Sequence, residues 1–138
     1  MKLSKLTSLL KFGKVTDHVL ESSDSEPYSD SDTLRENYMQ TYNLNGEKGT
    51  VFNIHYEGNA PVDLMILDPE NNRIYNRLLD DPDYHHSING YLYLNRREAN
   101  IEFTQPDDQQ YYFIIDNIDL LTNGANSGRS VKYTLTIS

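Results

Sequence analysis

The chain has 138 residues, no cysteine, and 21 acidic against 12 basic side chains, which gives a formal net charge of −9. Its length suits one domain with its own core, and the lack of cysteine excludes a disulfide framework, a thiolate nucleophile and a cysteine-ligated metal site. The negative charge repels phosphate backbones and argues against general nucleic-acid binding. The apolar stretches are far shorter than the ~20 residues that a membrane-spanning helix needs.

The first segment, Met1–Lys14, places four lysines around leucines whose spacing keeps Leu3, Leu6 and Leu10 on one face of a helix. This pattern predicts a helix that lies on a membrane surface or in a partner's groove, or else an arm that packs on its own domain or is disordered. A secretory signal needs a longer apolar core and a small-residue cleavage site, so the segment favours a cytoplasmic location.

An acidic segment, Glu21–Glu36, follows and is low in apolar residues, which is typical of a solvated linker. The sequence therefore predicts two parts. Residues 1–36 form an N-terminal extension, and residues 37–138 form the folded domain.

From Asn37 onward, short runs rich in aromatic and β-branched residues are separated by turn residues, without a helical pattern between them. The spacing predicts an all-β fold, an antiparallel β-sandwich of about eight short strands with jelly-roll-like topology, and an open or closed barrel is the alternative. The expected strands are Tyr38–Leu44, Thr50–Tyr56, Val62–Leu67, Ile74–Tyr75, Tyr91–Leu94, Ala99–Thr104, Tyr111–Asp116 and Val131–Ile137.

Apolar residues that alternate along these strands are the expected core, because alternate side chains of a strand point to the same face. They are Phe52, Ile54, Tyr56, Val62, Leu64, Ile66, Ile101, Phe103, Phe113, Ile115, Val131, Tyr133, Leu135 and Ile137.

Three segments, Leu44–Ile54, Pro61–Asp68 and Tyr111–Asn117, carry strand and turn motifs in an order that resembles two known families. One is the pre-peptidase C-terminal domain of bacteria and archaea, and the other is the Golgi-dynamics (GOLD-like) domain of membrane-traffic proteins. The resemblance covers residues 37–138. It implies a compact β-sandwich that binds or stabilises other molecules and does not catalyse a reaction.

Acidic side chains gather in the turn-prone segment that contains Asp80, Asp81 and Asp83, and Asp116 ends a predicted strand. Calcium takes several oxygen ligands from loops of this kind, so these four residues are a candidate calcium site if the two loops meet. Calcium is the only cofactor that the sequence suggests. The alternative is that the acidic turns are simply solvated.

The histidines do not form a recognisable zinc motif. His85 and His86 are adjacent, so in a strand they would point to opposite faces, and His18 and His55 lie far away in the sequence. We expect surface or cross-strand histidines. The sequence also lacks the serine and glycine-rich motifs of common hydrolases and phosphate-binding loops.

Tyr91 and Tyr93 alternate with Leu92 and Leu94, so one face of that strand presents two tyrosine rings. Tyrosine supplies a large contact area at low entropic cost, which makes this face a candidate surface for a protein partner. The alternative is that both tyrosines fill the margin of the core with their hydroxyls at its rim.

These observations predict a protein that is not an enzyme, a non-catalytic binding or accessory module for a protein partner. One alternative is a structural subunit that self-associates, with the N-terminal arm reaching a neighbour. Another is a calcium- or carbohydrate-binding domain, or an enzyme that uses the loop carboxylates.

Overall fold

The structure is a computed structural model that describes residues 2–9, 15–21, 27–121 and 123–138. The chain is mostly β, with one helix among the described residues, α1 (Pro69–Asp80), which is too short and too polar to cross a membrane. The strands are β1 (Lys2–Leu9), β2 (Val15–Glu21), β3 (Tyr28–Leu34), β4 (Tyr38–Asn45), β5 (Val51–Leu67), β6 (Tyr91–Thr104), β7 (Tyr111–Asn117) and β8 (Val131–Ile137).

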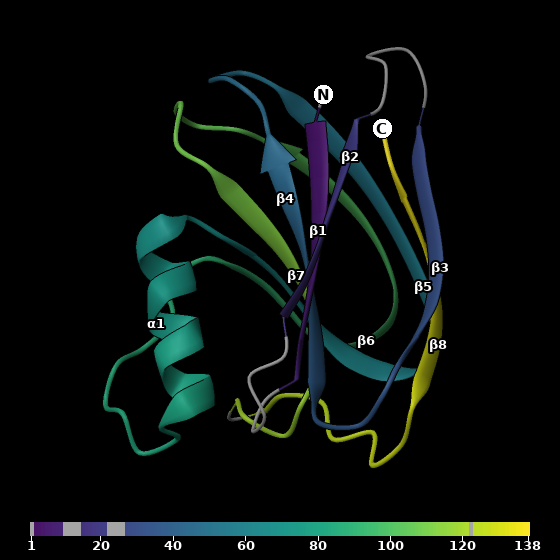
Figure 1. Ribbon diagram of the computed structural model, residues 1–138, viewed down its shortest axis with the longest axis vertical. Coiled ribbons are helices and arrows are strands. Elements are labelled where there is room, and N and C mark those ends of the chain that lie inside the picture. Colours follow the sequence, from purple (N-terminus) through teal and green to yellow (C-terminus); the bar gives the residue numbers. More distant parts are fainter. Residues whose placement is uncertain (1, 10–14, 22–26, 122) are drawn as a thin grey trace.

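The strands form one antiparallel sheet in the order β2-β1-β4-β7-β5-β8-β3, and β6 pairs with the other edge of β5. The long strand β5 joins two layers, because Ile54–Gly58 pairs with β8 whereas Asp63–Leu67 pairs with β7. The register between β5 and β6 shifts between these two halves. The sheet therefore curls over on itself into a half-barrel (Figure 1).

The strand β6 is strongly curled. The rings of Tyr91 and Phe103, at opposite ends of this strand, lie 5.2 Å apart between centroids, whereas an extended strand rises ~3.3 Å per residue. Asn95 has a positive φ of 58° within the strand, a conformation that asparagine tolerates better than most residues. The expected sandwich is thus correct in its antiparallel β character and differs in being one curled sheet.

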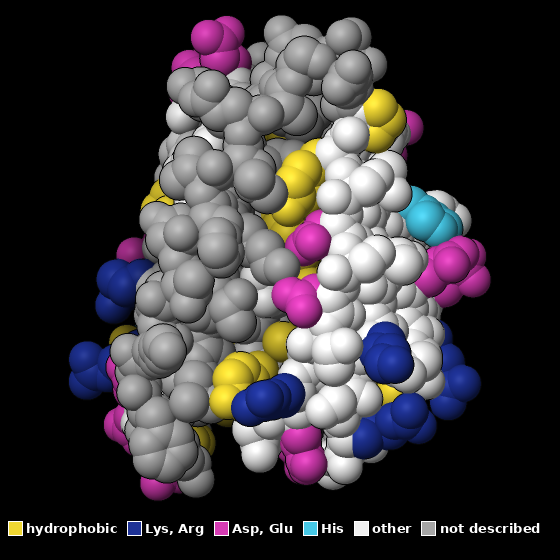
Figure 2. Space-filling view, turned by 45° about the vertical axis from the view of Figure 1, so that its right-hand side comes forward, with side chains coloured by type: hydrophobic (Ala, Val, Ile, Leu, Met, Phe, Trp, Pro, Cys, Tyr) yellow, Lys and Arg dark blue, Asp and Glu magenta, His cyan; other side chains and the backbone are white. Residues whose placement is uncertain are grey.

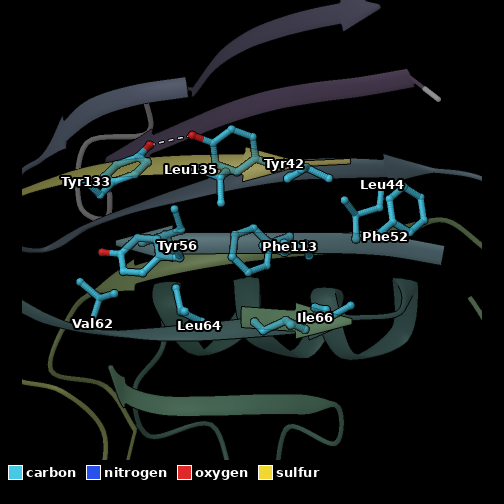
Figure 3. Packing of buried hydrophobic residues seen from close by; sticks show 14 of the residues in the cluster. Tyr42, Leu44, Phe52, Tyr56, Val62, Leu64, Ile66, Phe113, Tyr133 and Leu135 are labelled. Carbon is cyan, nitrogen blue, oxygen red and sulfur yellow. Dashed lines mark hydrogen bonds between the residues drawn. The ribbon is translucent and has the colours of Figure 1, made fainter. Parts of the chain in front are cut away.

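The core lies inside the curl and draws on both layers. Tyr42 from β4 and Tyr133 from β8 share a hydrogen bond of 2.7 Å between their hydroxyl oxygens, across the space that Phe113, Leu64 and Leu135 fill (Figure 3). All the apolar residues predicted for the core are buried, which confirms the alternation that identified them.

The helix α1 covers the outer face of the sheet, where it makes a second apolar cluster. Tyr75 and Leu79 of α1 pack there with Met65 of β5 and Ile114 of β7. Both faces of β7 are therefore buried, which is why its sequence is apolar almost throughout.

The prediction of a strand at Ile74–Tyr75 was wrong, because these residues belong to α1. Asp68 caps the helix, since its Oδ1 accepts a hydrogen bond of 2.8 Å from the backbone N–H of Asn71, and Pro69 occupies the first turn. Aspartate followed by proline is common in turns, but it is also a strong signal for the start of a helix.

Two pairs of predicted strands proved to be continuous. Thr50–Tyr56 and Val62–Leu67 belong to β5, and Tyr91–Leu94 and Ala99–Thr104 belong to β6. In β5 the intervening segment contains Gly58 and Pro61. There the strand is irregular, as at a bulge, and does not turn back.

The N-terminal region also differs from the expectation. Lys2–Leu9 is a strand that pairs with β4, and not a helix or a disordered arm, and Tyr28–Leu34 of the presumed linker pairs with β8. A helix of this length has little stability by itself, whereas pairing with a sheet edge satisfies the backbone hydrogen bonds. Residues 1, 10–14 and 22–26 lie outside the described residues, and the division at residue 36 stays a prediction.

Candidate protein-binding surface

The strand β6 leaves one edge open. Among the described strands it pairs only with β5, so the backbone N–H and C=O groups along its other edge have no partner strand. Such an edge is a ready site for another chain to bind, because it offers a row of hydrogen-bonding groups.

Apolar side chains flank the first part of this edge. Tyr91 is 46% exposed and Leu92 is 38% exposed. Together with Val51, they are the exposed large apolar side chains among the described residues. Tyr93 is half-buried and packs against the main core. We use the name β6 edge surface for Tyr91, Leu92 and Tyr93 together with the unpaired backbone edge beside them.

The core holds the Tyr91 ring in place. Its edge contacts Phe103 at an interplanar angle of 70°, and Phe103 in turn packs on Tyr111 with 5.2 Å between ring centroids. The Tyr111 hydroxyl donates a hydrogen bond to Asp107, and partial burial raises the pKa of Tyr111 to about 12. Tyr91 is therefore both exposed and supported from behind, so it would lose little conformational entropy on binding.

The middle of β6 is charged. Arg96, Arg97 and Glu98 are exposed where the strand bends. Aromatic residues with arginine are the composition that protein interfaces favour. That Tyr91 and Tyr93 contact a partner stays a prediction.

The structure does not bring the four predicted calcium ligands together. Asp80, Asp81 and Asp83 are exposed at the end of α1 and just after it, whereas Asp116 is buried in β7. Among the described residues, these four do not form a group of carboxylates close enough to share one ion. The calcium site stays a prediction.

Asp116 instead belongs to a buried acidic pair that sequence reasoning missed. It lies directly opposite Asp63 in the β5–β7 register, and both residues are fully buried. The Tyr75 hydroxyl donates to Asp116 at 2.6 Å, and the backbone N–H of Ile118 donates at 2.7 Å. Burial outweighs these bonds and raises the pKa of Asp116 to about 7.

Asp63 is held by two backbone donors, since its Oδ1 accepts from the N–H of Ala125 at 2.8 Å and from that of Asn95 at 2.9 Å. Burial raises its pKa as well, and nearby Asp119 adds to the effect. The other carboxylate oxygen, Oδ2, lies so close to Gly124 that a Cβ atom at position 124 would be only 2.5 Å from it, so a larger residue there would clash with Asp63. This aspartate ties β5 to the bend of β6 and to the loop before β8. The signal in the sequence was an aspartate within an apolar run.

His55 lies on β5, partly exposed, and its ring hydrogen-bonds across the strands to Asn100 of β6. This agrees with the expected cross-strand histidine. His85 and His86 are exposed in the segment after α1.

No family model matches the sequence, and no curated protein matches it. Among solved structures, the chain is similar to PliG of Aeromonas hydrophila, a periplasmic lysozyme inhibitor of g-type lysozyme. The TM-score is 0.56 at 10% sequence identity, over 86% of this chain and 91% of PliG.

This similarity corrects the resemblance to pre-peptidase C-terminal and Golgi-dynamics domains, which was wrong. The motifs that suggested it are strands and turns, and many unrelated β folds share such patterns. The curled half-barrel with its covering helix is instead similar in fold to PliG.

Proposed function

We propose that this protein is a non-catalytic protein-binding module and that its partner is a lysozyme or a related cell-wall hydrolase. The observation that carries the proposal is the fold similarity to PliG, which extends over nearly the whole of both chains. A fold alone does not specify a function, so the proposal also needs a surface fit for binding.

The β6 edge surface supplies that contact in this proposal. An exposed tyrosine and leucine beside an unpaired strand edge combine apolar contact area with backbone hydrogen-bonding groups. The net charge of −9 favours a cationic partner, because opposite charges accelerate encounter.

The test is to measure binding of the full chain to purified g-type and c-type lysozymes by calorimetry, together with inhibition of their lysis of bacterial cells. We expect saturable one-to-one binding to at least one lysozyme, with inhibition at matching concentrations. Replacement of both Tyr91 and Tyr93 by alanine should weaken binding at least tenfold, about 1.4 kcal/mol, which is typical for central interface tyrosines.

The matched control is Tyr84→Ala. Tyr84 is also a partly exposed aromatic residue, but it lies after α1, where it packs on His86 and Arg77. Equal loss of affinity in the control and in the double variant would show that the β6 edge surface is not the contact.

Lack of binding to every lysozyme tested would contradict the proposed partner. Sedimentation analysis of the protein alone would then test the self-association alternative, since an open strand edge can also pair with a second copy.

A further inference from the structure

A second group of side chains lies on the outward face of the paired strands β5 and β6. It consists of His55, Glu57 and Glu98, and one ligand atom from each lies within 4.8 Å of the others. Within the part of the chain that the structure describes, it is the one group of three such residues with this geometry. None of the three belongs to the β6 edge surface.

The register between β5 and β6 brings the three together. His55 and Glu57 are two residues apart in β5, so they share a face of the strand, and Glu57 lies directly opposite Glu98 of β6. Figure 2 shows a histidine and acidic side chains next to each other at the right-hand margin of this view. The paired backbones therefore place the three side chains close to one another.

The paired glutamates are electrostatically unfavourable without a cation. Like charges directly opposite on neighbouring strands destabilise a sheet. Among the described residues, no lysine or arginine forms an ion pair with Glu57 or Glu98. The Nε2 atom of His55 lies 3.1 Å from Glu57 Oε1, and this imidazole carries a positive charge only when it is protonated. A divalent cation between the carboxylates would remove this repulsion.

The orientation of His55 matches that of a metal ligand. Its Nδ1 hydrogen-bonds to the side-chain oxygen of Asn100, so Nε2 is the nitrogen that faces the carboxylates. Histidines that bind metals are usually oriented by such a bond from the other ring nitrogen.

The spacing is also suitable. Ligand atoms around a tetrahedral zinc ion with bonds of about 2.0–2.2 Å lie roughly 3.3–3.6 Å apart. His55 Nε2 and Glu57 Oε1 are already near this spacing at 3.1 Å. Rotation of the exposed Glu98 side chain would bring the third ligand in.

We propose that His55, Glu57 and Glu98 bind a divalent transition-metal ion, with zinc the best fit to one imidazole and two carboxylates. Three protein ligands leave a fourth position for water. The site lies outside the β6 edge surface, so it is independent of the proposed lysozyme binding.

The test is calorimetric titration of zinc chloride into the full chain after treatment with EDTA, with a thermal melt in parallel. We expect one equivalent of zinc to bind and to raise the melting midpoint, because a ligand that binds only the folded state stabilises it. His55→Ala and Glu98→Gln should each weaken zinc binding at least tenfold. Cobalt in place of zinc should give the visible absorption of a four-coordinate site.

The matched control is Glu102→Gln. Glu102 is an exposed glutamate of β6 that lies opposite Asn53, outside the cluster, so its replacement should leave zinc affinity unchanged. A second control, the double variant of His85 and His86 to alanine, should also bind zinc normally. The proposal is overturned if wild-type protein does not bind zinc, if Glu98→Gln binds it as tightly, or if only the His85 and His86 variant loses binding.

Discussion

At the residue scale, the buried pair of Asp63 and Asp116 is the least expected feature. Two carboxylates face each other across β5 and β7 in a position where most neighbours are apolar. Hydrogen bonds hold each one, from Tyr75 and Ile118 to Asp116 and from backbone donors to Asp63. Such a pair locks the geometry of the surrounding loops and makes stability sensitive to pH.

The first prediction concerns this pH dependence. The folded-state pKa of Asp116 is about 7, above its usual value of 3.8, so the folded protein holds a proton that the unfolded chain releases. The stabilisation from this group is complete below about pH 4 and is lost as the pH rises through 7. The resulting loss in the free energy of unfolding is on the order of 4 kcal/mol at most, since each pKa unit corresponds to 1.36 kcal/mol. Asp116→Asn should remove this pH-dependent loss.

Urea unfolding at several pH values between 4 and 8 would measure the effect. The groups that face Asp116 are the Tyr75 hydroxyl, the Ile118 N–H and the carboxyl of Asp63, and Asp119 lies near Asp63. The exposed residue Asp83 is the control, because Asp83→Asn should leave the pH profile unchanged. Parallel profiles for wild type and Asp116→Asn would contradict the prediction.

At the element scale, α1 depends on its N-terminal cap. The Asp68 carboxylate accepts from both the backbone and the side chain of Asn71, at 2.8 and 2.9 Å. Asp68→Ala should therefore destabilise the protein by about 1 kcal/mol, a typical cost of losing such a cap. Chemical denaturation at pH 7 would measure it.

The control for this prediction lies at the other end of the same helix. Asp80 is exposed at the C-terminal end, where a negative charge opposes the helix dipole, so Asp80→Ala should be neutral or slightly stabilising. An equal loss of stability in both variants would mean that the cap is not what stabilises the helix.

The same helix shows where sequence patterns were ambiguous. Ile74 and Tyr75 form an apolar pair that fits a short strand, but Tyr75, Leu78 and Leu79 also fit the buried stripe of a helix. Tertiary packing on the outer face of β5 and β7 makes the helix the stable choice. Short apolar runs do not contain that information.

At the scale of the whole molecule, β5 joins the two layers of the sheet. It pairs with β8 through its first half and with β7 through its second, and the core side chains of both layers form one cluster. Neither layer can keep its core when the other unfolds.

We therefore expect residues 27–138 to unfold in a single cooperative transition. Far-ultraviolet circular dichroism, which reports strands, and near-ultraviolet circular dichroism, which reports the buried tyrosines, should change at the same denaturant concentration. Phe113→Ala in the shared core should lower the free energy of unfolding by roughly 3–5 kcal/mol. Both transitions should then move together to a lower denaturant concentration. Two separate transitions would show that the layers are independent.

The sequence by itself determined the β class, the antiparallel strands and the identity of the core, because the alternation of apolar residues in segments such as Val131–Ile137 is a local property. It also singled out Tyr91 and Tyr93 as a candidate surface for a partner. The tertiary structure alone decided the curl of β5 and β6, the strands at Lys2–Leu9 and Tyr28–Leu34, and the contacts of Asp63 with Asp116 and of Glu57 with Glu98. These depend on which strands become neighbours, and strand pairing joins residues far apart in the chain that local patterns do not relate.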